Sequence, residues 1–147
     1  MSFFGIGIHN PKTSENVGTL WRSAHILGAS FIFVIGNRIK QQSSDTTSAW
    51  RSVPMYRYED FNKFYQNIPY DCQLVGVELD DKSTPIESFA HPKRAVYLLG
   101  AEDNGLPPAV RETCHKLIQL PLGNYNVAMA GTVTMYDRHY KEFSSKS

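Results

Sequence analysis

Short apolar runs that alternate with helix-like patterns are the feature of this sequence that most constrains its fold. Each run has the length of a strand and is almost continuously apolar, which is typical of strands buried on both faces. The predicted strands are Phe3–Ile8, Phe31–Ile35, Gln73–Glu78, Ala95–Leu99 and Leu117–Leu120. The predicted helices are Glu15–Leu27, Tyr58–Gln66, Pro108–Cys114 and Asn126–Phe143. Strands separated by helices in this way predict an α/β domain with a mainly parallel sheet flanked by helices.

The first predicted helix carries a signal at each end. Ser14 is predicted to cap its start, because a serine hydroxyl accepts a hydrogen bond from a backbone N–H of the first turn. Gly28 is predicted to end it in the left-handed conformation. Between the two, apolar residues recur at helical spacing, namely Val17, Leu20, Trp21, Ala24 and Leu27.

Composition excludes several classes of protein. Of 147 residues, 41% are hydrophobic and 20% charged, which excludes a disordered or collagen-like chain. The net charge of +1 excludes a histone-type nucleic-acid binder but leaves a local basic site open. Cys72 and Cys114 are too few for a disulfide framework or a zinc site, so buried, reduced thiols are expected. The apolar run Ala29–Gly36 is far shorter than the roughly 20 residues of a membrane span, and Met1–Gly7 lacks the basic start of a signal peptide. We therefore expect a cytoplasmic protein that binds neither a membrane nor a metal.

Polar or glycine-rich segments follow most of the predicted strands. In parallel α/β sheets, ligands bind beyond the carboxyl ends of the strands, so the segments after Ile8, Val77, Leu99 and Leu120 are candidate sites. Each segment alone is also explained by ordinary turn and helix-cap chemistry.

Two charged residues in these regions have both a functional and a structural interpretation. Arg22 shares a helix face with Glu15, Gly18 and His25, and it fits either an anion clamp or a surface arginine lying over a close helix contact. Glu102 lies in a glycine-containing loop, where it fits either a ligand contact or a carboxylate that faces water or caps a helix.

Aromatic and basic residues alternate near the end of the long polar segment 36–52. Such a pattern can stack bases and hold phosphates, or it can form a sheet edge with a solvated basic side. The residues concerned are Trp50, Arg51, Tyr56, Arg57 and Tyr58.

Taken in order, three segments resemble the motifs of the SpoU (TrmH-type) branch of the SPOUT RNA methyltransferases. They are residues 16–24 (Asn-Val-Gly-Thr-Leu-Trp-Arg-Ser-Ala), 98–107 (Leu-Leu-Gly-Ala-Glu-Asp-Asn-Gly-Leu-Pro) and 118–130. The resemblance runs from about residue 3 to residue 140, and it departs from the family where Asn124-Tyr125-Asn126-Val127-Ala128 replaces the usual Ser-Leu-Asn-Val-Ser.

The resemblance implies a single SpoU-type domain over residues 1–147, with no separate RNA-binding extension and with a C-terminal trefoil knot. It also implies S-adenosylmethionine as methyl donor, a homodimer, and transfer to a ribose 2′-hydroxyl of RNA, with tRNA favoured over rRNA. The alternatives are a non-catalytic RNA-binding protein of the same fold and a nucleotide-dependent α/β enzyme of another class.

The resemblance also assigns site residues, position by position. The implied catalytic residues are Asn16, Arg22, Glu102 and Asn126. The implied donor-binding residues are Val77, Gly100, Leu120 and Tyr125. A guanidinium is a poor proton acceptor, so we interpret Arg22 as a phosphate clamp that orients the substrate.

Overall fold

The computed structural model describes residues 2–39 and 52–145. Its strands are β1 (Phe3–His9), β2 (Phe31–Ile35), β3 (Met55–Tyr58), β4 (Gln73–Val77), β5 (Thr84–Pro85), β6 (Arg94–Gly100) and β7 (Lys116–Gln119). Its helices are α1 (Ser14–Leu27), α2 (Phe61–Gln66), α3 (Pro108–Thr113) and α4 (Val127–Ser145), with a 3-10 turn, η3, at Ile86–Ser88.

The strands form one sheet in the order β3-β2-β1-β6-β4-β7-β5, and every described strand pairing is parallel. The predicted α/β class with a mainly parallel sheet is therefore confirmed. The trefoil knot stays a prediction at this point, because strand pairing alone does not describe the path of the chain through the fold.

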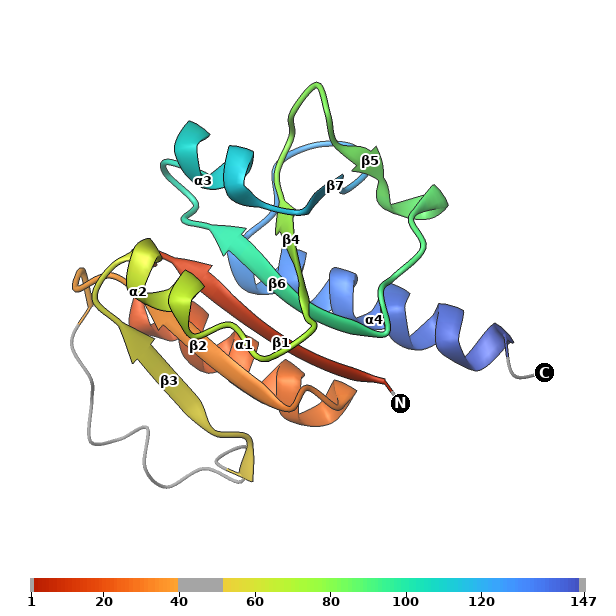
Figure 1. Cartoon of the computed structure of the whole chain (residues 1–147), viewed down its shortest axis with the longest axis horizontal. Helices are drawn as coiled ribbons and strands as arrows, with labels where there is room; N and C mark the ends of the chain where they lie inside the picture. Colours follow the sequence, from red (N-terminus) through yellow and green to blue (C-terminus); the bar gives the residue numbers. More distant parts are fainter. Residues whose placement is uncertain (1, 40–51, 146–147) are drawn as a thin grey trace.

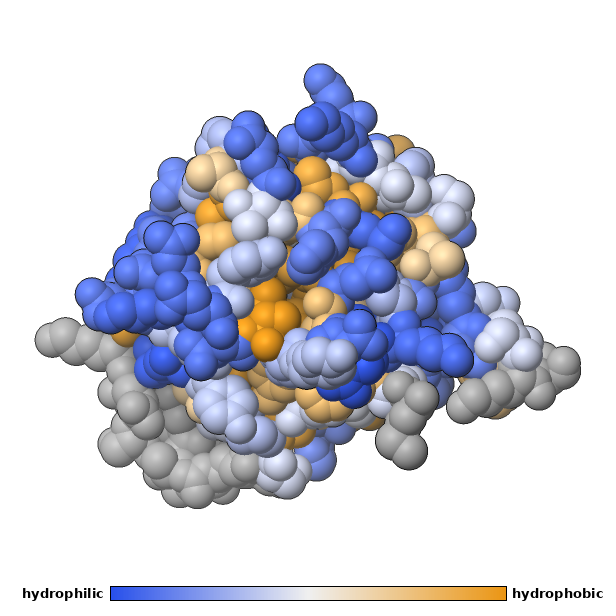
Figure 2. Space-filling view, viewed as in Figure 1, coloured by the Kyte–Doolittle hydropathy of each residue, from blue (hydrophilic) through white to orange (hydrophobic). Residues whose placement is uncertain are grey.

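Helices cover both faces of the sheet (Figure 1). Buried residues of α1 and α4 pack with Ile6, Ile8 and Val34 on one face. Residues of α2 and α3 pack with Phe33 and Leu98 on the other face. The surface seen in Figure 2 is mostly hydrophilic, with apolar residues showing between the polar ones near the middle. Within the described ranges, no helix has the length and apolar character needed to cross a membrane.

Two strands and one cap differ from the sequence prediction. β3 forms where a helix was predicted to begin at Tyr58, and α2 begins only after Asp60, whose carboxylate accepts a hydrogen bond from Lys63 N. The two-residue strand β5 is too short to give a periodic signal. Thr13, not Ser14, caps α1, because its hydroxyl accepts a hydrogen bond from Asn16 N at 3.2 Å. The predicted stop at Gly28 is confirmed, with φ at 88°.

Candidate active site

A cavity of about 660 Å³ lies at the carboxyl ends of β4, β6 and β7. Its lining comes from three stretches that are far apart in the sequence, 77–79, 99–105 and 119–130. All four residues that the resemblance assigned to donor binding, Val77, Gly100, Leu120 and Tyr125, are among those that line it. The volume is within the range of about 300–1,000 Å³ that is common for small-molecule sites.

The loop after β6 is folded tightly against its own start. Ala101 O accepts hydrogen bonds from Gly105 N at 2.8 Å and from Asn104 N at 3.3 Å. A Cβ added at Gly100 would lie 2.3 Å from the backbone carbon of Gly105, so a side chain has no room there. Gly100 therefore lines the cavity with backbone alone.

Glu78 fixes the far end of the same loop and was not singled out by sequence reasoning. Its Oε1 accepts a hydrogen bond of 2.8 Å from Leu106 N, and its carboxylate leaves little room for a Cβ at Gly105. The segment after Val77 was a candidate region on topology alone, and that position was the signal available for this residue.

Three side chains beside the cavity form a continuous hydrogen-bonded chain. Asn16 Nδ2 donates to Glu102 Oε2, and Asn126 Nδ2 donates to Asn16 Oδ1 at 2.9 Å. Three of the four implied catalytic residues are thus in direct contact, although they come from the start of α1, the loop after β6 and the start of α4.

Backbone hydrogen bonds at the starts of α1 and α4 hold the two asparagines in place. Asn126 Oδ1 accepts hydrogen bonds from Ala128 N at 2.9 Å and Met129 N at 3.3 Å, so Asn126 caps α4 while its amide nitrogen faces Asn16. Asn16 N is bound by the Thr13 hydroxyl at the start of α1. Each asparagine is therefore fixed by a helix start, where backbone N–H groups need partners.

Arg22 lies elsewhere in the single chain. It is exposed on α1, six residues beyond Asn16, which corresponds to about 9 Å of helix rise. Arg22 is not one of the described residues that line the cavity. One copy of the chain therefore brings together Asn16, Glu102 and Asn126 but leaves Arg22 at the surface.

Tyr125 occupies the position where the sequence departs from the family motif. Its hydroxyl donates to Pro121 O, which closes the turn that contains Leu122 and Gly123. Both of these residues have positive φ, at 52° and 77°. The bulky side chain thus holds the loop at the cavity rim in shape.

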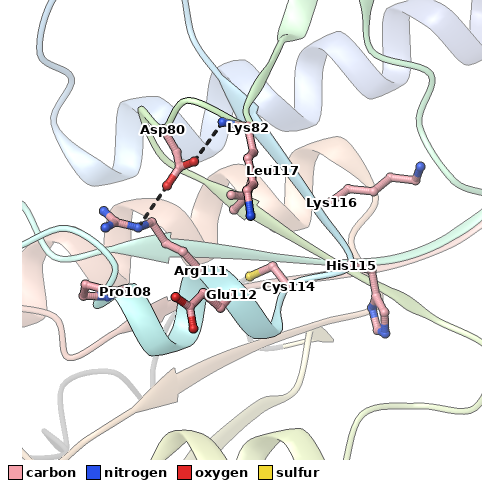
Figure 3. A pocket seen from close by; sticks show the side chains of 9 residues that line it. All are labelled: Asp80, Lys82, Pro108, Arg111, Glu112, Cys114, His115, Lys116 and Leu117. Atoms are coloured by element: carbon pink, nitrogen blue, oxygen red, sulfur yellow. Dashed lines mark hydrogen bonds and ion pairs between the residues drawn. The ribbon is translucent and has the colours of Figure 1, made fainter.

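A second hollow, of about 500 Å³, lies between α3, β7 and the residues after β4 (Figure 3). In this hollow, the Asp80 carboxylate accepts a hydrogen bond from Lys82 N at 2.8 Å and forms an ion pair with Arg111 at 3.3 Å. Cys114 also lines it, and burial raises the pKa of this thiol to about 12. The thiol is thus protonated at neutral pH. The charges of Asp80 and Arg111 are paired with each other.

Residues 2–39 and 52–145 contain no group of three His, Cys, Asp or Glu side chains arranged like metal ligands. Of the aromatic and basic run, Tyr56, Arg57 and Tyr58 lie in the edge strand β3, whereas Trp50 and Arg51 lie outside the described residues.

Comparison with known proteins gives consistent matches over nearly the whole chain. Residues 4–136 match the SpoU rRNA Methylase family. The chain is 32% identical over 138 residues to the 23S rRNA (guanosine-2′-O-)-methyltransferase RlmB of Acinetobacter baylyi, covering 84% of this chain and 54% of that protein. It is 25% identical over 160 residues to the 23S rRNA (uridine(2479)-2′-O)-methyltransferase of Streptomyces viridochromogenes, covering 99% of this chain and 55% of that protein. The chain thus spans about half the length of these relatives.

Solved structures share the fold. The SpoU methyltransferase AviRb from Streptomyces viridochromogenes, in complex with the cofactor AdoMet, superposes with a TM-score of 0.84 at 23% identity, covering 97% of this chain and 59% of that one. A structure described as giving insights into the 2-OH methylation of C/U34 on tRNA also has a TM-score of 0.84, at 18% identity, and covers 98% of both chains.

Proposed function

Because the chain belongs to the SpoU rRNA Methylase family, we propose that it transfers a methyl group from S-adenosylmethionine to a ribose 2′-hydroxyl of RNA. The observation that carries this proposal is the Glu102–Asn16–Asn126 chain beside a cavity at the carboxyl ends of three parallel strands. The described residues build a single sheet, which supports one SpoU-type domain. The family's trefoil knot is part of the same proposal.

The cavity suits the donor. Gly100 and Gly105 line it without side chains, so backbone N–H and C=O groups there can contact an adenine or an amino acid. Val77, Gly100, Leu120 and Tyr125 would hold the donor, with the Glu102 carboxylate at the rim favouring a cationic sulfonium. When bound, the donor supplies an electrophilic methyl group.

The three hydrogen-bonded residues then have distinct tasks. Glu102 accepts from Asn16 Nδ2 and Asn126 donates to Asn16 Oδ1, so the Asn16 amide is held from both ends. A fixed amide beside the cavity can orient a ribose hydroxyl, and positioning of this kind supplies much of the acceleration in a displacement reaction. In the transfer, the ribose oxygen gains the methyl carbon, the carbon–sulfur bond breaks, and the hydroxyl proton leaves to substrate phosphate or water.

A second copy of the chain is part of the proposal. An exposed stripe of large apolar residues runs along α4, formed by Met129, Val133, Tyr136, Tyr140 and Phe143. Ile26 of α1, one turn beyond Arg22, is 70% exposed, and Ser23 contacts Thr132 of α4 at 2.8 Å. Ser23 follows Arg22 and Thr132 precedes Val133 in the sequence, so α1 and α4 are in contact next to the stripe. We propose that this surface forms a homodimer and that Arg22 reaches the cavity of the partner copy as a phosphate clamp.

The RNA class is proposed from the solved structures that share the fold. The solved structure concerned with C/U34 of tRNA matches this chain over 98% of both lengths, which favours tRNA as the first substrate to test. The matched rRNA methyltransferases are covered over 54% and 55% of their lengths. Ribosomal RNA is the second substrate to test.

The deciding experiment combines binding and transfer. Titration calorimetry with S-adenosylhomocysteine should show a single site per chain, and incubation with labelled donor and bulk tRNA or rRNA should label ribose. An Asn16→Ala variant should lose transfer, whereas Asn67→Ala, which removes a side-chain amide bonded to Lys63 O on α2, should not. Donor binding without transfer to either RNA would instead support a non-catalytic RNA-binding protein. Absence of both donor binding and transfer in the folded protein would overturn the proposal.

A further inference from the structure

Asp103, the residue after Glu102, is tied to an arginine that follows β2. Arg38 Nη2 lies 2.5 Å from Asp103 Oδ2, and Arg38 Nη1 lies 3.2 Å from Asp103 Oδ1. The side chains of Arg38 and Asp103 are 30% and 34% exposed. This is a two-pronged guanidinium–carboxylate contact, the geometry in which such pairs are strongest and most directional.

The same guanidinium reaches a third segment. Arg38 Nη1 also donates to Asn10 O at 3.2 Å, in the turn between β1 and α1. Asn10 has a φ of 54°, and its N–H donates to Ile35 O at 2.6 Å. At Gly36 a Cβ would lie 2.9 Å from Asn10 Oδ1, so the turn is packed closely against the end of β2. Arg38 therefore joins three chain segments that meet around the active-site loop.

The pKa shifts of Arg38 and Asp103 keep both side chains charged, which favours the ion pair between them. The hydrogen bond from Arg38 lowers the pKa of Asp103, and Lys12 contributes in the same direction. The hydrogen bond with Asp103 raises the pKa of Arg38, and the charge of Glu102 acts in the same sense. The pair is thus fully ionised at neutral pH, and Glu102 lies within electrostatic reach of the guanidinium.

We propose that Arg38 is a positioning residue for the active site: it holds Asp103 and Asn10 together, and so keeps the Glu102 carboxylate where it accepts the hydrogen bond from Asn16. The consequence for catalysis rests on the proposed methyltransferase function, whereas the consequence for Asn16 does not. The competing role for Arg38 is a direct contact to RNA phosphate, but both of its terminal nitrogens already have acceptors within the protein.

The first test needs no enzymatic activity. In the full chain, the side-chain NH₂ resonances of Asn16 report its hydrogen bond to Glu102. Arg38→Ala and Asp103→Asn should both shift these resonances toward solvent-exposed values, while those of Asn67, bonded to Lys63 O, stay in place. Lys63→Ala, which breaks the surface pair with Glu59 at 2.9 Å, is the matched control and should leave Asn16 unchanged. Unchanged Asn16 resonances in Arg38→Ala would overturn the proposal.

The second test separates positioning from RNA contact. A displacement of about 1 Å in a catalytic group can cost about 10²-fold, so kcat should fall at least about tenfold in both Arg38→Ala and Asp103→Asn, with KM for RNA within about twofold of the wild type. A direct phosphate contact predicts the opposite pattern: a raised KM in Arg38→Ala and a lowered KM in Asp103→Asn, where the arginine is released. That pattern, or an unchanged kcat in both variants, would overturn the proposal. If the wild type transfers no methyl group, the proposed function fails and the Asn16 resonances still decide the role of Arg38.

Discussion

Asn126 Nδ2 donates a hydrogen bond of 2.9 Å to Asn16 Oδ1, although 110 residues separate the two in the chain. Each asparagine lies at the start of a helix, Asn16 in α1 and Asn126 immediately before α4. The contact fixes the orientation of the Asn16 amide, because its oxygen is the acceptor and only its nitrogen remains to donate to Glu102. One hydrogen bond thus connects helix capping to the arrangement of the candidate active site.

Replacing Asn16 tests this arrangement directly. Asn16→Ala leaves Glu102 without its donor and Asn126 Nδ2 without its acceptor, so transfer of label to RNA should fall by about 10²–10³-fold, the usual cost of removing one preorganised donor. The free energy of unfolding should change by less than about 1 kcal/mol, since the site lies at the surface of the fold. Initial rates and thermal melts measure the two effects, and a rate close to that of the wild type would remove Asn16 from the mechanism.

Mixed dimers test the role that we propose for Arg22 across a dimer interface. Arg22→Lys loses the two-pronged guanidinium and should lose most activity while S-adenosylhomocysteine still binds. Refolding this variant together with Glu102→Gln should restore about a quarter of the wild-type activity, because half of the dimers are hybrids and each has one complete site in a twofold assembly. If Arg22 serves its own subunit, the mixture stays inactive.

Sedimentation of a Tyr136→Glu variant, which places a charge on the exposed α4 stripe, should show a monomer.

The parts of the fold that follow a strong period could be predicted from sequence. The buried strands and α1 were found because uninterrupted apolar runs and a clear helical stripe leave few alternatives. β3 was predicted only as one of two interpretations of the aromatic and basic run, because an edge strand with one partner and partly exposed side chains gives no such apolar run. Thr13 and Ser14 are adjacent hydroxyl residues, and only the backbone conformation decides which of them caps the helix.

The candidate site was predictable in part, for a different reason. The motifs identified Asn16, Glu102 and Asn126, and topology explains why they meet: the carboxyl ends of parallel strands share one edge of the sheet. Arg38 and Glu78 were missed because each acts by pairing with a residue far away in sequence. A lone arginine in a polar segment carries no sign of such a partner.

Two glycine substitutions should have opposite effects on stability. A Cβ at Gly100 would lie 2.3 Å from the Gly105 backbone, so Gly100→Ala should displace the loop, lower the free energy of unfolding by about 1–3 kcal/mol and weaken S-adenosylhomocysteine binding. At Gly18, inside α1, no atom lies within 4 Å of an added Cβ in the single chain. Gly18→Ala should therefore raise the free energy of unfolding by about 0.5–1 kcal/mol. Denaturant titration measures both, and a stable Gly100→Ala with unchanged ligand affinity would contradict the loop geometry.

Acid should destabilise the protein through a buried histidine. His91 Nδ1 lies 2.6 Å from Tyr97 Oη, and His91 Nε2 lies 2.7 Å from Asp137 Oδ2. Arg138 Nη1 donates to the same phenol oxygen at 3.0 Å, so Tyr97 can donate its proton only to a neutral His91. Burial is the main cause that lowers the pKa of His91, ahead of the opposing effect of Asp137, and the charges of Lys141 and Arg138 lower it further.

The sign of the effect follows from this lowered pKa. The unfolded chain takes up a proton near pH 6.5, before the folded chain does, so stability is complete above that pH and decreases as the pH falls below it, by at most about 1.4 kcal/mol per pH unit for one group. Burial also lowers the pKa of His9, which adds to the loss in the same range. Urea titrations between about pH 5 and 7.5 should show a shallower decrease for His91→Gln than for the wild type. An identical acid dependence in His91→Gln and the wild type would show that His91 is not responsible.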